Sequence, residues 1–527
     1  MMTGEKYVLA VDHGTSGVKT ALMSVTGRLV GFEFEKTDTV FIPPGGAEQD
    51  PESWWRALLN TCKKLTDRGL VKVEDIVAVC CSSTFSSTVA VDFEGRHLDN
   101  SLTWMDSRGA PYIKRLVKGF PSVDGYGVFK VLQWIRKTGG GPQLSGKDDI
   151  AHVLFWKHER PQVYEKAHKF LSSKDYLNLR LTGKIAAGFD SMTLFWATDI
   201  RDVNDMRYDA GLAARMGLDI EKLPDMKRSI DVVGELLPEV AEEIGLQKGV
   251  KVVCGSPDHQ SACIGSGAVR DFEGHIYIGT SSWIQCIIPF KKTDMFHSIA
   301  SFPTSIPGKY ECANEQDIAG GALSFFLDRF VFPDNELRQG GVPEGVYAKL
   351  DRVAEGAPPG SNKVIFTPWL NGERTPVDNT TVRAGFHNLC VSTSPEDIAR
   401  SVLEGVALNG RWALKYIERY IGREMGTLNM VGGGAMSDLW CRIHADVMDR
   451  TVRKVKDPMQ TNARGAAFIA AVGMGHISFD QVPGLVEYEK TFEPDPRNRA
   501  IYDELFREFL TIYKKNKSMY KRLNRVS

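Results

Sequence analysis

Residues 7–20 read YVLAVDHGTSGVKT: an apolar run, a turn and the start of a second run. Tyr7–Val11 favours a strand, residues 12–17 are turn-forming, and the extended pattern resumes over Val18–Val25. The same order returns at residues 275–288, HIYIGTSSWIQCII, where a Gly-Thr-Ser turn separates two strands. Two such hairpins, about half a chain apart, predict an internal duplication.

The segments around these hairpins mix strands and helices. Leu29–Phe34 continues the first sheet, Asp50-Pro51 is typical of a helix start, and Ile76–Cys81 has the composition of a buried strand. Residues 394–397 (SPED) form a second strong helix start. This pattern predicts helices together with a parallel or mixed sheet.

Composition excludes several classes of protein. The chain has 527 residues, which at about 150 residues per domain predicts about two to four domains. Its 65 Lys and Arg against 66 Asp and Glu give a net charge of -1, so nothing in the bulk charge suits a nucleic-acid partner. Nine cysteines without a CxxC pair argue against a zinc cluster or a disulfide framework. With no signal-peptide pattern and no run of about 18 apolar residues, we expect a cytoplasmic protein without a membrane segment.

The first hairpin has the chemistry of a phosphate site. Gly14, Thr15 and Ser16 expose backbone N–H groups and add two hydroxyls, and Asp12 before them could hold a hydrated magnesium ion. The segment resembles a Walker A loop only superficially, because its glycine spacing differs and it joins two strands. A hairpin without function is the alternative.

Two further segments follow predicted strands. Gly432, Gly433 and Gly434, with Ser437, open a helix after Leu428–Val431 and could line a groove for a nucleoside, or form a plain tight turn. Asp258 follows Val252–Cys254 and is well placed to be a general base. His259 is either a core histidine or a substrate ligand.

Together with five further segments, this order of motifs resembles the FGGY carbohydrate kinase family, closest to its xylulokinase-like branch, over about residues 6–485. The five segments are residues 48–55 (EQDPESWW), 104–108 (WMDSR), 174–183 (KDYLNLRLTG), 372–376 (GERTP) and 384–389 (AGFHNL). The resemblance implies an α/β fold of two actin-like (RNase H-like) domains with a nucleotide cleft between them. The implied ranges are 1–268 for a sugar-binding domain, 269–485 for a nucleotide-binding domain and 486–527 for a C-terminal helical tail.

The resemblance also implies a reaction, in which the γ-phosphate of ATP passes to a sugar hydroxyl with the help of Mg²⁺. By resemblance Asp258 is the catalytic base and Asp12 lies near magnesium, which it holds through water. The other implied roles are γ-phosphate binding by Thr15, Thr280 and Gly279, adenosine binding by Gly320, Gly321 and the Gly432–Gly434 cluster, and sugar binding by Trp104, Asp106 and Arg108. Phosphoryl transfer needs mainly positioning and charge neutralisation, which these residue types supply.

The sequence departs from xylulokinases on the sugar side. Phe85 and Ser86 stand where a Met-His pair is usual, and His259 stands where Asn is usual. We expect a ketopentose such as xylulose as substrate and Phe85, Ser86 and His259 as its ligands. The alternatives are a kinase of the same family for another ketose or a polyol, and an actin-like ATPase module. Homodimers are common in the family, so a homodimer is a further expectation.

Overall fold

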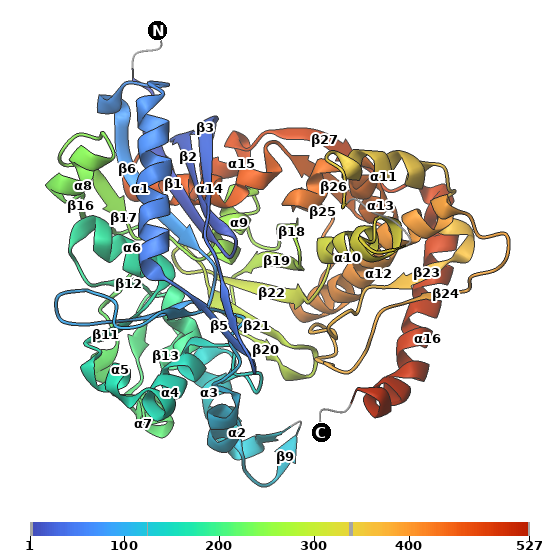
Figure 1. The fold of residues 1–527 in the computed structure, drawn as a ribbon, viewed down its shortest axis with the longest axis horizontal. Helices are drawn as coiled ribbons and strands as arrows, with labels where there is room; N and C mark the ends of the chain where they lie inside the picture. The colour runs from blue at the N-terminus through green and yellow to red at the C-terminus, as the bar shows by residue number, and fades with distance from the viewer. Residues whose placement is uncertain (1–3, 124, 337–340, 525–527) are drawn as a thin grey trace.

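The protein divides into two halves that lie side by side (Figure 1). The computed structural model describes residues 4–123, 125–336 and 341–524. The extreme ends of the expected first domain and tail, residues 1–3 and 525–527, lie outside the described residues. In Figure 1 the first half of the chain, blue to green, lies on the left and most of the second half, yellow to red, lies on the right.

The first half is built on a six-stranded sheet of order β16-β17-β6-β1-β2-β3. Within it, β1, β6 and β17 are parallel, whereas β2, β3 and β16 pair antiparallel with their neighbours. The strands are β1 (Tyr7–Gly14), β2 (Gly17–Ser24), β3 (Leu29–Lys36), β6 (Ile76–Ser83), β16 (Val232–Glu235) and β17 (Lys251–Val253).

The second half repeats this sheet. Its eight strands have the order β20-β21-β22-β19-β18-β25-β26-β27. They are β18 (Gly274–Ile278), β19 (Ser282–Ile288), β20 (Thr293–Asp294), β21 (Ile299–Pro303), β22 (Tyr310–Gln316), β25 (Thr427–Val431), β26 (Thr451–Val455) and β27 (Tyr488–Phe492). The run β22-β19-β18-β25-β26-β27 has the same strand directions as β3-β2-β1-β6-β17-β16. The predicted duplication and the two actin-like α/β halves are therefore confirmed.

Helices cover both faces of the first sheet because its strands alternate buried apolar side chains above and below. The helices α1 (Pro51–Asp67), α6 (Ser173–Thr182) and α8 (Pro238–Glu243) pack on the face that carries Leu9 and Val11. Helix α14 (Thr461–Gly473) packs on the opposite face, which carries Val8 and Ala10. As predicted, the Asp50 side chain caps α1 by accepting the amide of Glu52.

Helix α14 also crosses α9 (Asp258–Gly265), and two glycines allow the close approach. A Cβ on Gly265 would lie 1.9 Å from the carbonyl oxygen of Thr461, and one on Gly465 would lie 1.8 Å from that of Ser261. Any larger residue at either position would force the helices apart. This crossing joins the helix that begins at Asp258 to a helix contributed by the second half of the chain.

A second sheet in the first half, of order β11-β7-β8-β5-β4, is antiparallel throughout. Its strands are β4 (Val40–Ile42), β5 (Gly46–Gln49), β7 (Thr88–Val91), β8 (Ser101–Leu102) and β11 (Lys169–Ser172). The loop after β8 carries Trp104, Asp106 and Arg108. This sheet therefore presents the expected sugar-binding segment.

The helices α12 (Pro395–Ile421) and α16 (Arg499–Leu523) pack in the core of the second half. The predicted start of α12 is confirmed, since Ser394 and Asp397 form a reciprocal capping box. Strand β27 and helix α16 fall in the range expected to be a tail, yet β27 pairs with β26 and α16 buries Tyr502 and Phe509 in the core. The domain boundaries at 268 and 485 stay predictions.

The remaining elements connect these units. The helices are α2 (Ala110–Val117), α3 (Val128–Thr138), α4 (Asp149–Glu159), α5 (Pro161–Lys166), α7 (Ala210–Met216), α10 (Gly320–Phe326), α11 (Val346–Glu355), α13 (Asp438–Met448) and α15 (Val482–Leu485). The short strands are β9 (Ser122–Val123), β10 (Tyr126–Gly127), β12 (Ala187–Gly188), β13 (Thr198–Asp199), β14 (Arg207–Tyr208), β15 (Met226–Lys227), β23 (Ile365–Thr367) and β24 (Gly385–His387).

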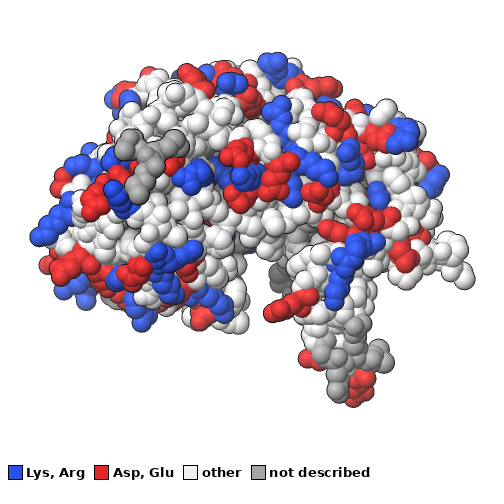
Figure 2. Space-filling view, turned by 90° about the horizontal axis from the view of Figure 1, so that it is seen from above, with Lys and Arg blue, Asp and Glu red and all other residues white. Residues whose placement is uncertain are grey.

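The helices and the surface charge bear on the expected absence of membrane and nucleic-acid partners. Across the described residues, no helix is both long and apolar enough to cross a membrane. The face in Figure 2 carries positive and negative side chains interspersed, without a large area of one sign.

The first hairpin differs in one detail from the prediction. Asp12 and His13, which we expected in the turn, belong to β1, so the turn consists of Thr15 and Ser16. The strand continues because β1 stays paired with β6 as far as Asp12–Ser82 and His13–Ser83. Asp12 is therefore held by a sheet and not by a loop.

Candidate active site

Three segments of the candidate site lie at one edge of the first sheet. Asp12, the loop that follows Ser83 and the loop before Asp258 come at the carboxyl ends of β1, β6 and β17. These strands are parallel neighbours, so their carboxyl ends meet at the same edge. The topology of the sheet therefore brings Asp12 and Asp258 to the same edge, although they lie 246 positions apart in sequence.

Asp258 begins helix α9, and its carboxylate faces Phe85. It accepts the amide N–H of His259 at 2.9 Å, and the backbone of Phe85 lies close enough to lower its pKa slightly. Burial raises the pKa of Asp258 to about 6, and the nearby charge of Asp12 adds to the increase. Such a carboxylate is ionised at neutral pH and is a stronger base than an exposed aspartate, which suits a general base.

Asp12 is buried, and both halves of the molecule reach it. Lys19 Nζ lies 3.8 Å from its Oδ2, and Asn462 Nδ2 of α14 lies 3.4 and 3.5 Å from its two oxygens. Within the part of the chain that the structure describes, no group of three or more His, Cys, Asp or Glu could hold a metal. One carboxylate completed by water and phosphate is nevertheless the donor set that Mg²⁺ favours, so Asp12 fits that ion.

The two hairpin turns carry the hydroxyls expected to meet phosphate. Thr15 is part-exposed and Ser16 is exposed, as is Thr280 in the second hairpin. Burial raises the pKa of Tyr277, next to the second turn, and Asp12 and Asp258 raise it further. The carboxyl end of β18 therefore lies within electrostatic range of both carboxylates.

The glycine clusters surround the end of β18. Gly432 has φ +83°, and a Cβ there would lie 2.6 Å from the carbonyl oxygen of Ile278. Gly433 is exposed, a Cβ on Gly434 would lie 2.5 Å from Cγ2 of Ile278, and Ser437 caps α13 by accepting the amide of Trp440. Gly432 and Gly434 are thus buried against the end of β18, and Gly433 is the exposed glycine of the cluster. Adenosine binding by the cluster stays a prediction.

The backbone amides of Gly320 and Gly321 are hydrogen-bonded to the turn of the second hairpin. Their amides donate to the carbonyls of Gly279 and Thr280, at 2.8 and 3.0 Å. A Cβ on Gly320 would lie 2.4 Å from the Gly279 oxygen. These N–H groups are therefore already bonded, and only the Cα side of Gly320 and Gly321 remains for a ligand.

The aromatic rings of the expected sugar site come from both halves. The His259 ring lies between Phe85, with centroids 6.1 Å apart, and Trp283, with centroids 4.3 Å apart. Its Nε2 lies 3.2 Å from Oε1 of Glu315 on β22. Ser86 has φ +55° and donates from its hydroxyl to the carbonyl of Lys147 at 2.9 Å. Ser86 can therefore still accept a hydrogen bond from a substrate hydroxyl.

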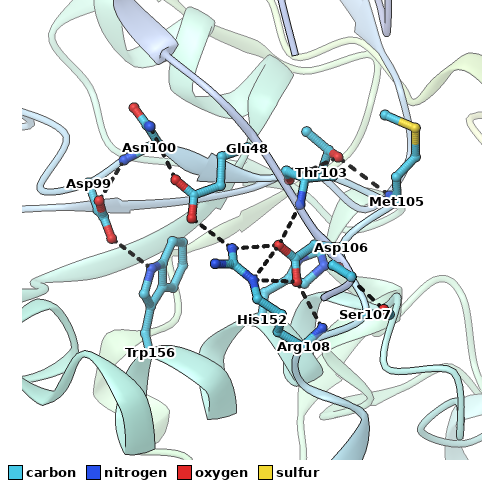
Figure 3. Close-up of polar contacts among 12 residues, drawn as sticks. Glu48, Asp99, Asn100, Thr103, Met105, Asp106, Ser107, Arg108, His152 and Trp156 are labelled. Atoms are coloured by element: carbon cyan, nitrogen blue, oxygen red, sulfur yellow. Dashed lines mark hydrogen bonds and ion pairs between the residues drawn. The ribbon is translucent and has the colours of Figure 1, made fainter. Parts of the chain in front are cut away.

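Asp106 and Arg108 form a network of polar contacts with Glu48 (Figure 3), in the loop that also carries Trp104. Asp106 is fully buried and accepts the Ala47 amide at 3.0 Å and the Arg108 guanidinium at 2.6 Å. Arg108 also donates to Glu48 on β5 at 2.7 Å. These ion pairs fix the loop, and they use the Nε and Nη2 groups of Arg108 but not its Nη1. Substrate binding by Asp106 and Arg108 stays a prediction.

The structure adds residues that the sequence reasoning did not single out. Arg374 pairs with Glu315 and with Asp317 on the second-half side of the site. Lys147 lies beside Ser86, and Asn462 of α14 lies beside Asp12. Arg374 lies in the GERTP segment, which marked the family but carried no assigned role. The other residues form no local motif, so only their position in the fold identifies them.

The duplicated sheets and the facing carboxylates and hydroxyls define a phosphotransferase of actin-like fold. The chain belongs to the FGGY family of carbohydrate kinases: the family's N-terminal domain matches residues 7–265 and its C-terminal domain matches residues 274–474. It is therefore a sugar kinase, and members of this family use ATP as the phosphate donor.

Individual relatives span the whole chain. A xylulose kinase of Bacillus subtilis is 26% identical, over 98% of both chains. A gluconokinase of the same species is 25% identical, over 98% of this chain and 97% of its own. The structure of a ligand-bound xylulose kinase from Lactobacillus acidophilus has a TM-score of 0.86 at 23% identity, over 98% of this chain and all of that one. At that identity the structural likeness supports the fold.

Proposed function

We propose that the protein phosphorylates a ketose, with D-xylulose the first candidate, and that Asp258 is the base. The observation that supports this most strongly is the position of the Asp258 carboxylate. It lies at the edge of the sheet between Phe85 and His259 on the sugar side and Asp12 on the phosphate side. The xylulose kinases among the relatives supply the choice of sugar.

In this proposal a sugar hydroxyl attacks the γ-phosphorus of ATP. The new O–P bond forms while the bond to the β,γ-bridging oxygen breaks, and the hydroxyl proton passes to the Asp258 carboxylate. The backbone amide of His259 holds that carboxylate. Thr15, Ser16 and Thr280 would donate to the phosphate oxygens, where charge accumulates during the transfer.

Two further groups need binding sites, Mg²⁺ and the adenosine of ATP. Asp12 would hold Mg²⁺ through water, and the ion would neutralise phosphate charge. The surface of Gly432, Gly433 and Gly434, with Ser437 at the start of α13, is the proposed adenosine site, and Gly279, Gly320 and Gly321 frame the turn beside it. The homodimer and the cytoplasmic location stay predictions.

A sugar acid is a second candidate for the acceptor, because of Lys147. In the described part of the chain its ammonium group has no ion-pair or hydrogen-bond partner, although burial lowers its pKa. It lies beside Ser86 and within electrostatic range of Arg374 and Asp317. A part-buried cation without a partner favours a substrate with a carboxylate, and a gluconokinase is among the relatives.

A panel of acceptors tests the proposal. ADP release should be slow with ATP alone and should rise with D-xylulose, measured beside D-ribulose, xylitol, glycerol and D-gluconate. Turnover with D-gluconate that is lost in Lys147→Met, while turnover of neutral sugars persists, would establish the second candidate. Failure of every acceptor to stimulate ADP release would overturn the proposed function.

A further inference from the structure

Trp104 is hydrogen-bonded to the first phosphate hairpin. Its indole Nε1 lies 3.0 Å from Oγ1 of Thr15, 89 positions away in sequence. An indole N–H can only donate, so the Thr15 hydroxyl accepts this bond. The proton of that hydroxyl is therefore left for another acceptor. The part-exposed Thr15 is the residue proposed above to meet the γ-phosphate.

The backbone of Thr15 is fixed from the other side. Gln49 donates from Nε2 to the Thr15 carbonyl oxygen at 2.8 Å, and Gln49 in turn accepts from Trp54 Nε1 at 3.1 Å. Gln49 and Trp54 are both buried, so this support is rigid. The direction of the Thr15 side chain is then set by its bond to Trp104.

The ring of Trp104 also faces the second half of the molecule. The guanidinium carbon of Arg374 lies 5.9 Å from the ring centroid. Arg374 is held by Glu315, and its Nε lies 3.2 Å from Asp317. Trp104 therefore has its polar edge on the phosphate hairpin and its ring close to a side chain that approaches from the opposite half.

We propose that Trp104 is a positioning residue that couples the sugar site to the phosphate site through Thr15. A sugar packed against the ring would hold the indole N–H on the Thr15 hydroxyl. A hydroxyl that accepts such a bond becomes a better donor, here toward the γ-phosphate. The inference rests on the proposed roles of Thr15 and of the sugar site, and it adds a connection between them.

The coupling has a thermodynamic consequence. If a bound sugar favours the Thr15 geometry that binds phosphate, the sugar must increase nucleotide affinity, and nucleotide must increase sugar affinity by the same factor. The ratio of nucleotide affinities with and without sugar measures the whole coupling, and the change of this ratio in a Trp104 variant measures the contribution of Trp104.

Two substitutions isolate the bond. Trp104→Phe keeps an aromatic ring but removes the N–H, and Thr15→Val removes the hydroxyl at nearly constant shape. We expect Trp104→Phe to lower kcat about tenfold, the effect of losing the one hydrogen bond that orients the Thr15 hydroxyl. Sugar affinity without nucleotide should change less than about threefold. Thr15→Ser, which keeps the hydroxyl, should lose far less kcat than Thr15→Val and serves as the matched variant.

The double variant decides between coupling and independent roles. After Thr15→Val, the additional Trp104→Phe change should have little further effect on kcat, and either variant should abolish the effect of sugar on nucleotide affinity. A double variant whose loss in kcat equals the product of the two single losses would overturn the inference. So would a Trp104→Phe enzyme with the kcat of wild type and the same effect of sugar on nucleotide affinity. A wild-type enzyme without sugar-dependent turnover would instead overturn the proposed function, so the two failures are distinguishable.

Discussion

His259 Nε2 lies 3.2 Å from Glu315 Oε1, so the residue next to Asp258 is tied to strand β22 of the other half. Burial lowers the pKa of His259, and the neutral imidazole can donate to Glu315 only with its proton on Nε2. Glu315 in turn pairs with Arg374, whose guanidinium faces Trp104. The candidate site is thus assembled by both halves of the chain.

This arrangement predicts the effect of removing His259. His259→Ala should raise the KM for the sugar by about tenfold, because a buried polar contact is lost, and leave the KM for ATP within about threefold. Glu315→Gln, which keeps a hydrogen-bonding side chain beside the imidazole, is the matched variant and should have a smaller effect. Unchanged sugar affinity in a folded His259→Ala protein would assign His259 to packing between the halves.

Asp258 should make stability depend on pH. Its folded pKa of about 6 lies above the ordinary 3.8, so the folded state binds the proton more tightly than the unfolded state. The resulting stabilisation is complete below about pH 4 and is lost as pH rises through 6. Asp258→Asn should therefore be more stable than wild type at pH 7, by at most about 3 kcal/mol. Denaturant titrations at pH 4.5 and 7.5 measure this difference, and an equal gain at both values would contradict the assigned pKa.

Asp12 should determine the magnesium requirement. Asp12→Ala should raise the Mg²⁺ concentration for half-maximal activity at least about tenfold, since it removes the proposed carboxylate ligand. Sugar affinity measured calorimetrically without nucleotide should stay near wild type. An equal loss of sugar affinity would move Asp12 to the sugar site or to a structural role.

A buried ion pair should stabilise the loop that leads to Asp258. Lys174 Nζ lies 2.5 Å from Asp175 Oδ1 and 3.4 Å from the carbonyl oxygen of Cys254, and Lys174 and Asp175 are both fully buried. Lys174→Met leaves the carboxylate unpaired and should cost about 3–5 kcal/mol of unfolding free energy. Lys166→Met, at an exposed lysine, is the control and should change stability little. Equal thermal unfolding of the two variants would contradict the structural role.

Local sequence patterns predicted the parts of the fold that depend on neighbours in sequence. The two hairpins, the cap at Asp50 and the capping box at Ser394 are confirmed because turn and cap chemistry depends on a few adjacent residues. The predicted start of the turn at Asp12 is wrong because pairing with β6, a long-range contact, extends the strand.

The contacts within the site could not be predicted in the same way. The approach of Asn462 to Asp12 spans 450 positions, and the bond between Trp104 and Thr15 joins two different sheets. No periodicity or spacing encodes such contacts, because they result from the packing of whole elements. The resemblance named residues of the sugar segment, yet only the structure shows that Asp106 is enclosed by protein groups.

The most direct test measures phosphorylated sugar formed by wild type and by Asp258→Asn, at saturating ATP and the best acceptor of the panel. Removing a general base costs about 10²–10⁴-fold in rate. We predict that wild type forms the phosphosugar, and that Asp258→Asn binds nucleotide normally but forms the product at a rate lower by that factor. A folded Asp258→Asn enzyme that works within a few-fold of wild type would contradict the assignment of Asp258 as the base.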